Sequence, residues 1–318
     1  MKVIFAGTPA NAARTLEALI AGPHEVVAVL TRPDAEVGRK RVLTPSPVAQ
    51  IAEAAGIKTF KATKVDETLS AELTATGAAL GVVVAYGALF KSHVLNALPL
   101  GWVNLHYSLL PDWRGAAPVQ NAVLSGDVDT GVTLFQLDEG MDTGPVFGTV
   151  ATTIQVGETS GRLLERLTEL GITLLNQELP LIEAGIAKGI PQNSGAVARL
   201  ASKPTREGAR IDWNETASAI ERKVLGMNPE PMAHTTLGGE TFRILDAVNL
   251  GVAPDGLLEE ASMPGTIVFE AKRVMAVCGN NTLLQLKTVQ PAGKNPMPAL
   301  DWSRGAANKF SSFDVEVA

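Results

Sequence analysis

Asn104 and His106 lie two positions apart in the otherwise apolar segment Trp102–His106. If this segment is a β-strand, both side chains project to the same face as Trp102, because successive residues of a strand alternate between its two faces. Ligands of open α/β sheets bind at the carboxyl ends of parallel strands. A lone histidine is more often a structural residue, so the structural and catalytic interpretations both stay open. The amide of Asn104, two positions earlier on the same strand, favours the catalytic interpretation of His106.

Three carboxylates, Asp138, Glu139 and Asp142, lie in the segment 137–144, which we expect to form a loop between two strands. Carboxylates in such a loop are commonly exposed to solvent. One of them could instead lie against His106, where it would hold the imidazole in one tautomer or accept a proton.

Other chemistries lack the patterns that they require. The four histidines form no H-x-H or H-x-x-x-H pair and Cys278 is the only cysteine, so we predict no metal site. Ser108 has no G-x-S-x-G elbow around it, which argues against a serine hydrolase. The turn at Gly7 has neither the dinucleotide fingerprint nor the P-loop pattern, so an ordinary strand-to-helix turn is expected there.

A basic cluster, Arg39, Lys40 and Arg41, follows Gly38. The whole chain has 27 basic and 33 acidic residues, a net charge of −6. Most short charge clusters are solvated loops. This cluster could instead contact nucleic-acid phosphates, because a local positive field does not need a basic protein overall.

Apolar runs that alternate with helical patterns fill the first half of the chain. Strands rich in Val, Ile and Leu between helices are typical of a parallel sheet that is covered on both faces. We therefore predict an α/β fold with a mostly parallel sheet and helices on both faces. The expected strands are 2–6, 26–30, 80–85, 102–106, 130–137 and 146–154, and the expected helices include 47–55 and 159–184.

The periodicity fails between residues 188 and 210, where proline and glycine lie among polar residues. A helix near 215–225 and several short β-like runs follow, which indicates a small β-barrel or sandwich. We expect a first domain at 1–188, a linker at 189–208 and a smaller domain at 209–318.

The composition is that of a folded protein in a reducing compartment. Of the 318 residues, 46% are hydrophobic, which excludes a mainly disordered chain. A single cysteine excludes an intramolecular disulfide framework and favours the cytoplasm. The uncharged stretch 73–90 is long enough to span a membrane, but its glycines and β-branched centre favour a turn and a buried strand. We expect a soluble, cytoplasmic protein.

Several motifs resemble those of the folate-dependent formyltransferases. The core motif is Asn104-Leu105-His106-x-Ser108-Leu109-Leu110-Pro111, followed by Arg114-Gly115-Ala116-Ala117-Pro118-x-Gln120 and by Asp142-Thr143-Gly144. Other blocks resemble the methionyl-tRNA formyltransferases within this family. These blocks are 5–9, 82–87, 209–213, 228–231 and 290–294, and they are spread across nearly the whole chain.

The resemblance implies transfer of the formyl group of 10-formyltetrahydrofolate to the amine of methionine on initiator tRNA. It implies a Rossmann-like catalytic domain and a C-terminal barrel of the OB-like type, and we expect a monomer without a metal. Asn104, His106 and Asp142 take the catalytic positions by matching the motif. By the same resemblance, the residues expected to bind the folate are Tyr86, Gly87, Ser108, Leu109, Leu110 and Pro111, and those expected to bind the tRNA are Arg39, Lys40 and Arg41.

The side-chain types suit this reaction. Attack of an amine on the formyl carbon gives a tetrahedral intermediate with negative charge on oxygen, to which Asn104 and His106 can donate hydrogen bonds. Asp142 can take the proton that the attacking amine loses, directly or through water, and can orient His106. No covalent enzyme intermediate is needed.

Some residues depart from the family pattern. Tyr107 stands where a small residue is usual, so it either crowds the folate entrance or points into the next layer. Glu230 and Asn295-Pro296 also differ from the usual residues.

The alternative functions are a related formyltransferase acting on a sugar nucleotide or a glycinamide ribonucleotide and a non-catalytic RNA-binding protein. A nicotinamide oxidoreductase is disfavoured by the missing fingerprint.

Overall fold

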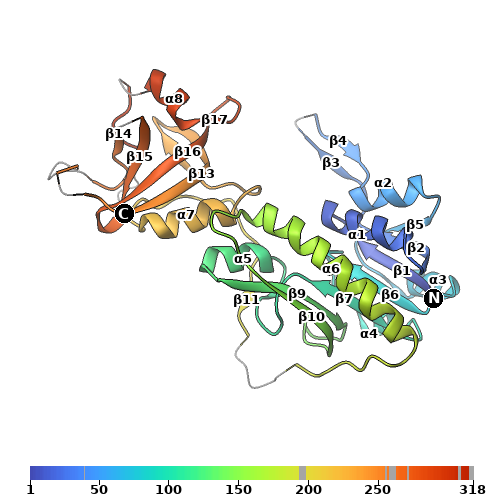
Figure 1. Cartoon of the computed structure of the whole chain (residues 1–318). Coiled ribbons are helices and arrows are strands. Elements are labelled where there is room, and N and C mark those ends of the chain that lie inside the picture. The colour runs from blue at the N-terminus through green and yellow to red at the C-terminus, as the bar shows by residue number, and fades with distance from the viewer. Residues whose placement is uncertain are drawn as a thin grey trace. The chain divides into compact units, whose positions relative to one another are not determined.

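The computed structural model describes residues 1–38, 40–192, 198–254, 256–257, 263–270, 272–306 and 309–314 (Figure 1). The chain forms two compact units. Unit 1 comprises Met1–Pro118, Asp129–Thr153 and Leu164–Ala201, and unit 2 comprises Val119–Val128, Ile154–Leu163 and Ser202–Ala318. Because both units are discontinuous along the chain, the domain limits at 188 and 209 stay a prediction.

Unit 1 is built on a seven-stranded sheet in the order β10-β9-β7-β6-β1-β2-β5. The strands from β5 to β7 are parallel, whereas β9 is antiparallel to both β7 and β10. The mostly parallel sheet predicted from the sequence is thereby confirmed. The strands are β1 (Lys2–Gly7), β2 (Glu25–Thr31), β5 (Lys58–Lys61), β6 (Leu80–Val84), β7 (Trp102–His106), β9 (Asp129–Gln136) and β10 (Val146–Thr153).

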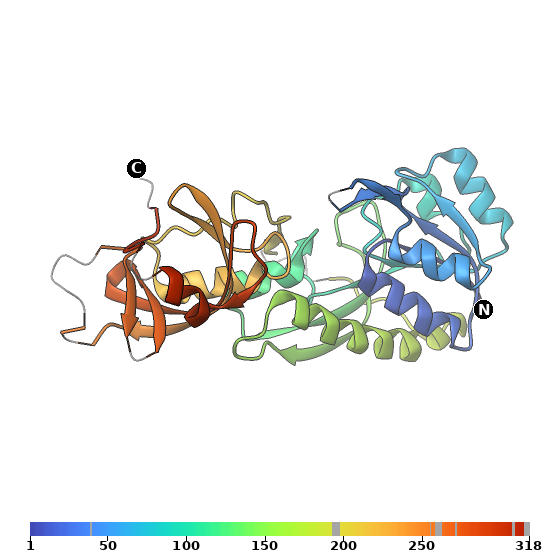
Figure 2. The same cartoon turned by 90° about the horizontal axis from the view of Figure 1, so that it is seen from above.

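Helices cover both faces of this sheet. On one face, α1 (Ala10–Ile20) and α6 (Ser160–Glu183) lie side by side and are joined by the ion pair of Arg14 with Glu169 (Figure 2). On the other face, the Trp102 indole N–H of β7 donates to the Val94 carbonyl of α4 at 2.7 Å. The further helices of unit 1 are α2 (Pro47–Ala54), α3 (Glu67–Ala75) and α4 (Ser92–Leu95).

The apolar strands bury their side chains against these helices. Ile4 and Ala6 of β1 join Leu30 of β2 and Val83 of β6 in the cluster that also holds Trp102. All five residues of β6 are buried, which explains its uninterrupted apolar sequence. This rigid sheet ends where the polar residues of the candidate site begin.

Four short strands of unit 1 carry no clear sequence pattern. The basic segment forms a hairpin of β3 (Ala35–Val37) and β4 (Val42–Thr44), where we expected only a loop. Next to the candidate site, β8 (Arg114–Gly115) pairs in parallel with β11 (Leu200–Ala201). Leu200 and Ala201, which lie in the expected linker, therefore pair with the first two residues of the Arg114–Pro118 motif.

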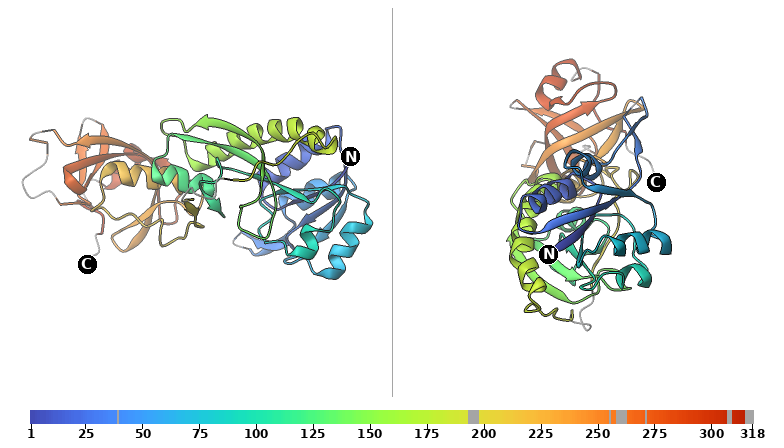
Figure 3. Two further views of the ribbon diagram at one scale, coloured as in Figure 1. Left: turned by 90° about the horizontal axis from the view of Figure 1, so that it is seen from below. Right: turned by 90° about the vertical axis from the view of Figure 1, so that its right-hand side faces the viewer.

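Unit 2, whose strands are orange to red in Figure 3, holds an antiparallel sheet in the order β12-β13-β16-β15-β14. Residues 312–314 bridge its two edges, because Ser312 pairs with Thr266 and Asp314 with Thr236 of β12. Trp213 stacks on Phe313 inside, with ring centroids 4.7 Å apart. The elements are α5 (Pro118–Ser125, mostly in this unit), α7 (Ala217–Gly226), β12 (His234–Leu237), β13 (Glu240–Val252), β14 (Ile267–Glu270), β15 (Arg273–Cys278), η1 (Gly279–Asn281), β16 (Thr282–Pro291), β17 (Met297–Pro298) and α8 (Ala299–Ala306).

Candidate active site

Strand β7 presents Asn104 on the expected face. Trp102 contacts α4, whereas Leu105 lies against Gly171 of α6, so the side chains of the strand alternate as predicted. The Asn104 side chain is half-buried, and no hydrogen bond joins its amide to any residue of the described ranges. A half-buried amide without a protein partner is available to a ligand.

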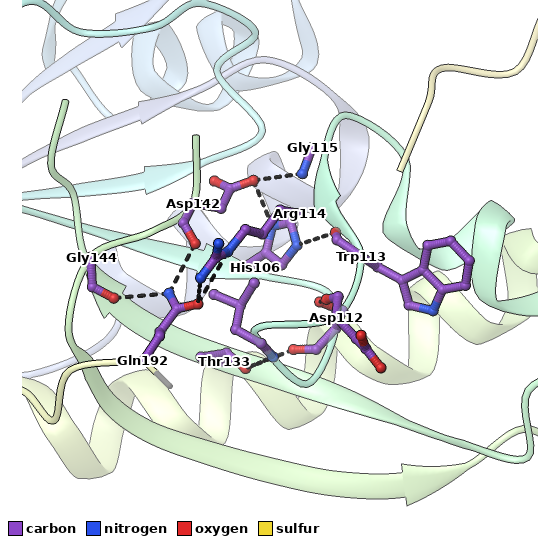
Figure 4. Close-up of polar contacts among 11 residues, drawn as sticks. His106, Asp112, Trp113, Arg114, Gly115, Thr133, Asp142, Gly144 and Gln192 are labelled. Atoms are coloured by element: carbon purple, nitrogen blue, oxygen red, sulfur yellow. Dashed lines mark hydrogen bonds and ion pairs between the residues drawn. The ribbon is translucent and has the colours of Figure 1, made fainter. Parts of the chain in front are cut away.

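His106 has one ring nitrogen engaged and one facing a carboxylate (Figure 4). Its Nε2 lies 2.9 Å from the Trp113 carbonyl, which can only accept, so Nε2 carries the hydrogen. Its Nδ1 faces Asp142 Oδ2 at 3.8 Å, too far for a hydrogen bond. The Trp113 carbonyl thus sets the tautomer and leaves Nδ1 as the ring atom that can meet a substrate.

Burial lowers the pKa of His106, while the nearby Asp142 carboxylate and the bond to the Trp113 carbonyl raise it and only partly offset the effect. The neutral ring therefore directs the Nδ1 lone pair at Asp142. Two acceptors then face each other with no proton between them. A substrate N–H that enters this gap can donate to both. Because Nε2 donates to the Trp113 carbonyl and Nδ1 carries no hydrogen, the expectation that His106 donates to the oxyanion is not met in this arrangement, and Asn104 remains the expected donor.

The lowered pKa makes stability depend on pH. The unfolded chain binds a proton at His106 near a pH of about 6.5, whereas the folded chain binds it only at lower pH. The contribution of His106 to the free energy of unfolding is therefore fully present above a pH of about 6.5. It is lost as the pH falls toward the lower pKa that His106 has in the folded protein. We expect the urea-unfolding free energy to fall between pH 7 and pH 5 less steeply in His106→Gln than in the wild type. Parallel curves for the two proteins would contradict this expectation.

Asp142 is held by a backbone N–H and by a side chain from two other segments. Its Oδ2 accepts a hydrogen bond from the Gly115 N–H at 2.7 Å. The residue has a φ of 55°, a left-handed conformation that costs a non-glycine residue about 1–3 kcal/mol. The Gln192 side chain donates to the carbonyls of Asp142 and Gly144, which helps to hold this conformation. Gly144 must be glycine, because a Cβ there would lie 1.8 Å from the Gln136 carbonyl oxygen.

Residues 108–112 form a turn shortly after β7, in which the Asp112 N–H donates to the Leu109 carbonyl at 3.1 Å. Ser108 is buried, and its hydroxyl donates to the Asp112 carbonyl at 2.6 Å. Thr133 of β9 donates to the Ser108 carbonyl and accepts from the Leu110 N–H. The Ser108 hydroxyl thus closes the turn, while Leu109, Leu110 and Pro111 are half-buried and partly accessible.

Tyr86 and Gly87 follow β6 at the neighbouring strand end. The Tyr86 side chain is buried, and its hydroxyl donates to the Ala62 carbonyl at 2.7 Å. Gly87 has a φ of 88° and open space on the side where a Cβ would lie. Tyr107 points into the helical layer, since its hydroxyl accepts from the Asn11 amide of α1, so it does not crowd the strand ends.

Lys40 and Arg41 of the basic cluster lie at the tip of the β3–β4 hairpin. Arg39 is outside the described residues. Lys40 is exposed, and Arg41 pairs with Glu36 at 3.0 Å on an exposed surface. Within the described residues, neither Lys40 nor Arg41 forms a hydrogen bond or an ion pair with a residue of the site at the end of β7.

The structure therefore brings His106 and Asp142 together beside the Asn104 strand face. Sequence reasoning missed the partners that orient them, Trp113, Gly115 and Gln192. Gly115 lies in a motif that was noted, but the sequence carries no signal for Gln192. Within the described ranges, no group of three or more His, Cys, Asp or Glu side chains could hold a metal ion, and no helix is long and apolar enough to cross a membrane.

Two family models match the chain. The first, described as formyl transferase, matches residues 1–179, and the second, described as formyl transferase, C-terminal domain, matches residues 203–307. Relatives named methionyl-tRNA formyltransferase share much of the sequence. The protein of Arthrobacter sp. (strain FB24) is 48% identical over 305 residues, covering 96% of this chain and 97% of its own. That of Streptomyces coelicolor is 46% identical over 308 residues, covering 96% and 97%.

Solved structures share the fold at low sequence identity. An N-formyltransferase from Helicobacter canadensis, in complex with folinic acid and dTDP-3-aminofucose, has a TM-score of 0.65 and 17% identity, covering 92% of this chain and 99% of its own. HypX from Aquifex aeolicus, in complex with tetrahydrofolic acid, has a TM-score of 0.61 and 15% identity, covering 99% and 49%. By the family models and the near full-length relatives, the chain belongs to the formyl transferase family.

Proposed function

We propose that this protein transfers the formyl group of 10-formyltetrahydrofolate to the amine of methionine on initiator tRNA, giving the formylated initiator of translation. The observation that carries the reaction type is the site at the end of β7. There the Asn104 amide, which has no partner among the described residues, lies on the same strand face as His106, whose Nδ1 is 3.8 Å from the Asp142 carboxylate. Relatives with this named activity, up to 48% identical over 96% of the chain, support the choice of acceptor.

The folate supplies the formyl group as a co-substrate. The Asn104 amide donates to the formyl oxygen, whose negative charge grows as the tetrahedral intermediate forms. The gap between Nδ1 of His106 and Oδ2 of Asp142 receives the N–H of the attacking amine, because both atoms are acceptors. When the new C–N bond has formed and the bond to the folate nitrogen breaks, the proton taken from the amine passes to that nitrogen.

In our proposal, the folate contacts only the accessible groups among the residues that we expect to bind it. Leu109, Leu110 and Pro111 offer a half-buried apolar edge beside β7, and Gly87 leaves open space at the end of β6. The Ser108 hydroxyl and the Tyr86 side chain are buried and already bonded to backbone carbonyls. In our proposal these two residues therefore shape the folate site and do not themselves bind the folate.

The acceptor is tested by offering the protein and 10-formyltetrahydrofolate four amines: methionyl initiator tRNA, methionyl elongator tRNA, an amino-sugar nucleotide and glycinamide ribonucleotide. We expect a formyl mass gain confined to the initiator. Formylation of a small amine with none of the charged tRNA would favour the alternative, a small-amine formyltransferase.

We propose that the β3–β4 hairpin contacts the tRNA through Arg39, Lys40 and Arg41. Replacing all three by alanine should raise the KM for tRNA and reduce the salt dependence of tRNA binding by about one unit of slope per lost phosphate contact. Folate binding should not change. The control Lys64→Ala/Lys91→Ala removes exposed cations elsewhere in unit 1. An unaltered KM for tRNA across salt concentrations in the triple variant would argue against this contact.

A further inference from the structure

The Gln192 side chain uses all of its hydrogen-bonding groups at the candidate site. Its Nε2 donates to the carbonyl oxygens of Asp142 and Gly144, each at 2.9 Å. Its Oε1 accepts from Nε of Arg114 at 3.2 Å and from Nη2 at 2.5 Å. One amide thus connects the loop that carries Asp142 to the segment that carries Gly115 (Figure 4).

The two connected segments also meet at the reacting end of the site. The Gly115 N–H donates to Asp142 Oδ2, the oxygen that faces Nδ1 of His106. The orientation of this carboxylate therefore depends on how the loop and the Arg114–Gly115 segment lie relative to each other. The Gln192 side chain bonds to both of them.

The chain on either side of residues 193–197 is anchored to the same region. Ile190 exchanges two backbone hydrogen bonds with Val146, each at 2.8 Å. Arg199 pairs with Asp112 at 2.8 Å and lies over the Trp113 ring at 4.2 Å. β11 then pairs with β8. Gln192 is thus delivered to the site by a segment that is itself fixed, which is what a positioning role requires.

We propose that Gln192 is a positioning residue of the active site, which holds the Asp142 carboxylate at the correct distance from His106 and the substrate amine. This inference rests on the proposed formyl transfer for its kinetic part only. Gln192 acts through the two hydrogen bonds that its Nε2 donates, because these bonds hold the backbone of Asp142 in its left-handed conformation.

The test compares Gln192→Met, which removes all four hydrogen bonds, with Gln192→Glu, which keeps an acceptor for Arg114 but sets oxygen against two carbonyl oxygens. Displacing a catalytic group by about 1 Å can cost about 100-fold, so we expect kcat to fall about 10- to 100-fold in both variants. The KM for 10-formyltetrahydrofolate should not change. Recovery of the wild-type kcat in Gln192→Glu would overturn the inference, because only the bond to Arg114 would then matter.

Gln136→Met is the matched control. The Gln136 amide also donates to two backbone carbonyls, those of Leu100 at 3.4 Å and Trp102 at 3.1 Å, which lie at the amino end of β7, whereas His106 lies at its carboxyl end. We expect this variant to lose thermal stability and to keep its kcat. If kcat falls as far in Gln136→Met as in Gln192→Met, the effect of Gln192 is a general loss of stability and the inference fails.

Hydrogen exchange separates this inference from the proposed function, because it needs no substrate. The Gly115 amide should exchange faster in Gln192→Met than in the wild type, since its acceptor Asp142 Oδ2 is no longer held in place. Unchanged protection of this amide would overturn the positioning role. Faster exchange in a protein whose wild type does not formylate methionyl-tRNA would support the positioning role and refute the proposed acceptor.

Discussion

Asp142→Asn is expected to lower the single-turnover rate of formyl transfer by about three orders of magnitude, the range in which a general base contributes. The amide keeps an oxygen that can accept from the Gly115 N–H, and the Gln192 bonds go to backbone carbonyls, so the loop should keep its conformation. What is lost is the second proton acceptor that faces Nδ1 of His106. The measurement is rapid-quench transfer of labelled formyl to methionyl initiator tRNA.

Asp138→Asn is the control for Asp142→Asn. Asp138 lies in the same loop and bonds to the Thr143 hydroxyl and the Gly140 N–H, but no hydrogen bond or ion pair of the described residues joins it to His106. We expect this variant to retain most of the wild-type rate. A near-normal rate in Asp142→Asn would remove the carboxylate from the mechanism.

Asn104→Ala should lower kcat by about 100- to 1,000-fold, the usual cost of removing one donor to an oxyanion. Because no hydrogen bond joins the Asn104 amide to the described residues, the substitution leaves no protein group without its partner. Stability should therefore change by less than about 0.5 kcal/mol. Steady-state kinetics and urea unfolding measure the two effects separately.

Two further variants sharpen the test of Asn104. Asn104→Asp keeps the size of the side chain but places negative charge beside the developing oxyanion, so it should be at least as slow as Asn104→Ala. Asn11→Ala removes an amide that bonds to the Tyr107 hydroxyl in the helical layer, and it should cost stability with little loss of kcat. An Asn104→Ala protein that is unstable but turns over normally would indicate a structural amide.

The strand that carries the site was predictable because its physics is local. Trp102, Asn104 and His106 were expected on one face from the alternation of a strand alone, and the contacts of Trp102 and Leu105 confirm that alternation. The apolar runs of β1, β2 and β6 were predictable from a second local pattern, because strands buried on both faces have uninterrupted Val, Ile and Leu sequences.

The partners that orient the site were not predictable, because they depend on backbone conformation and on contacts distant in sequence. Trp113, whose carbonyl accepts from His106, has a φ of 61°. A tryptophan in the sequence gives no indication of this left-handed conformation. Gln192 meets the carbonyl of Asp142, a residue 50 positions earlier in the chain. It lies in a polar, proline-containing segment whose pattern indicates only a linker.

The most direct test of the account is a crystal structure of the protein with a stable 10-formyl analogue of the folate. The account predicts that the formyl oxygen lies about 2.7–3.2 Å from the Asn104 amide nitrogen, the range of a hydrogen bond. It also predicts that the formyl carbon is open to attack from the side of His106 Nδ1 and Asp142 Oδ2. An analogue bound with its formyl group away from the end of β7, or with Asn104 still without a partner, would contradict the account.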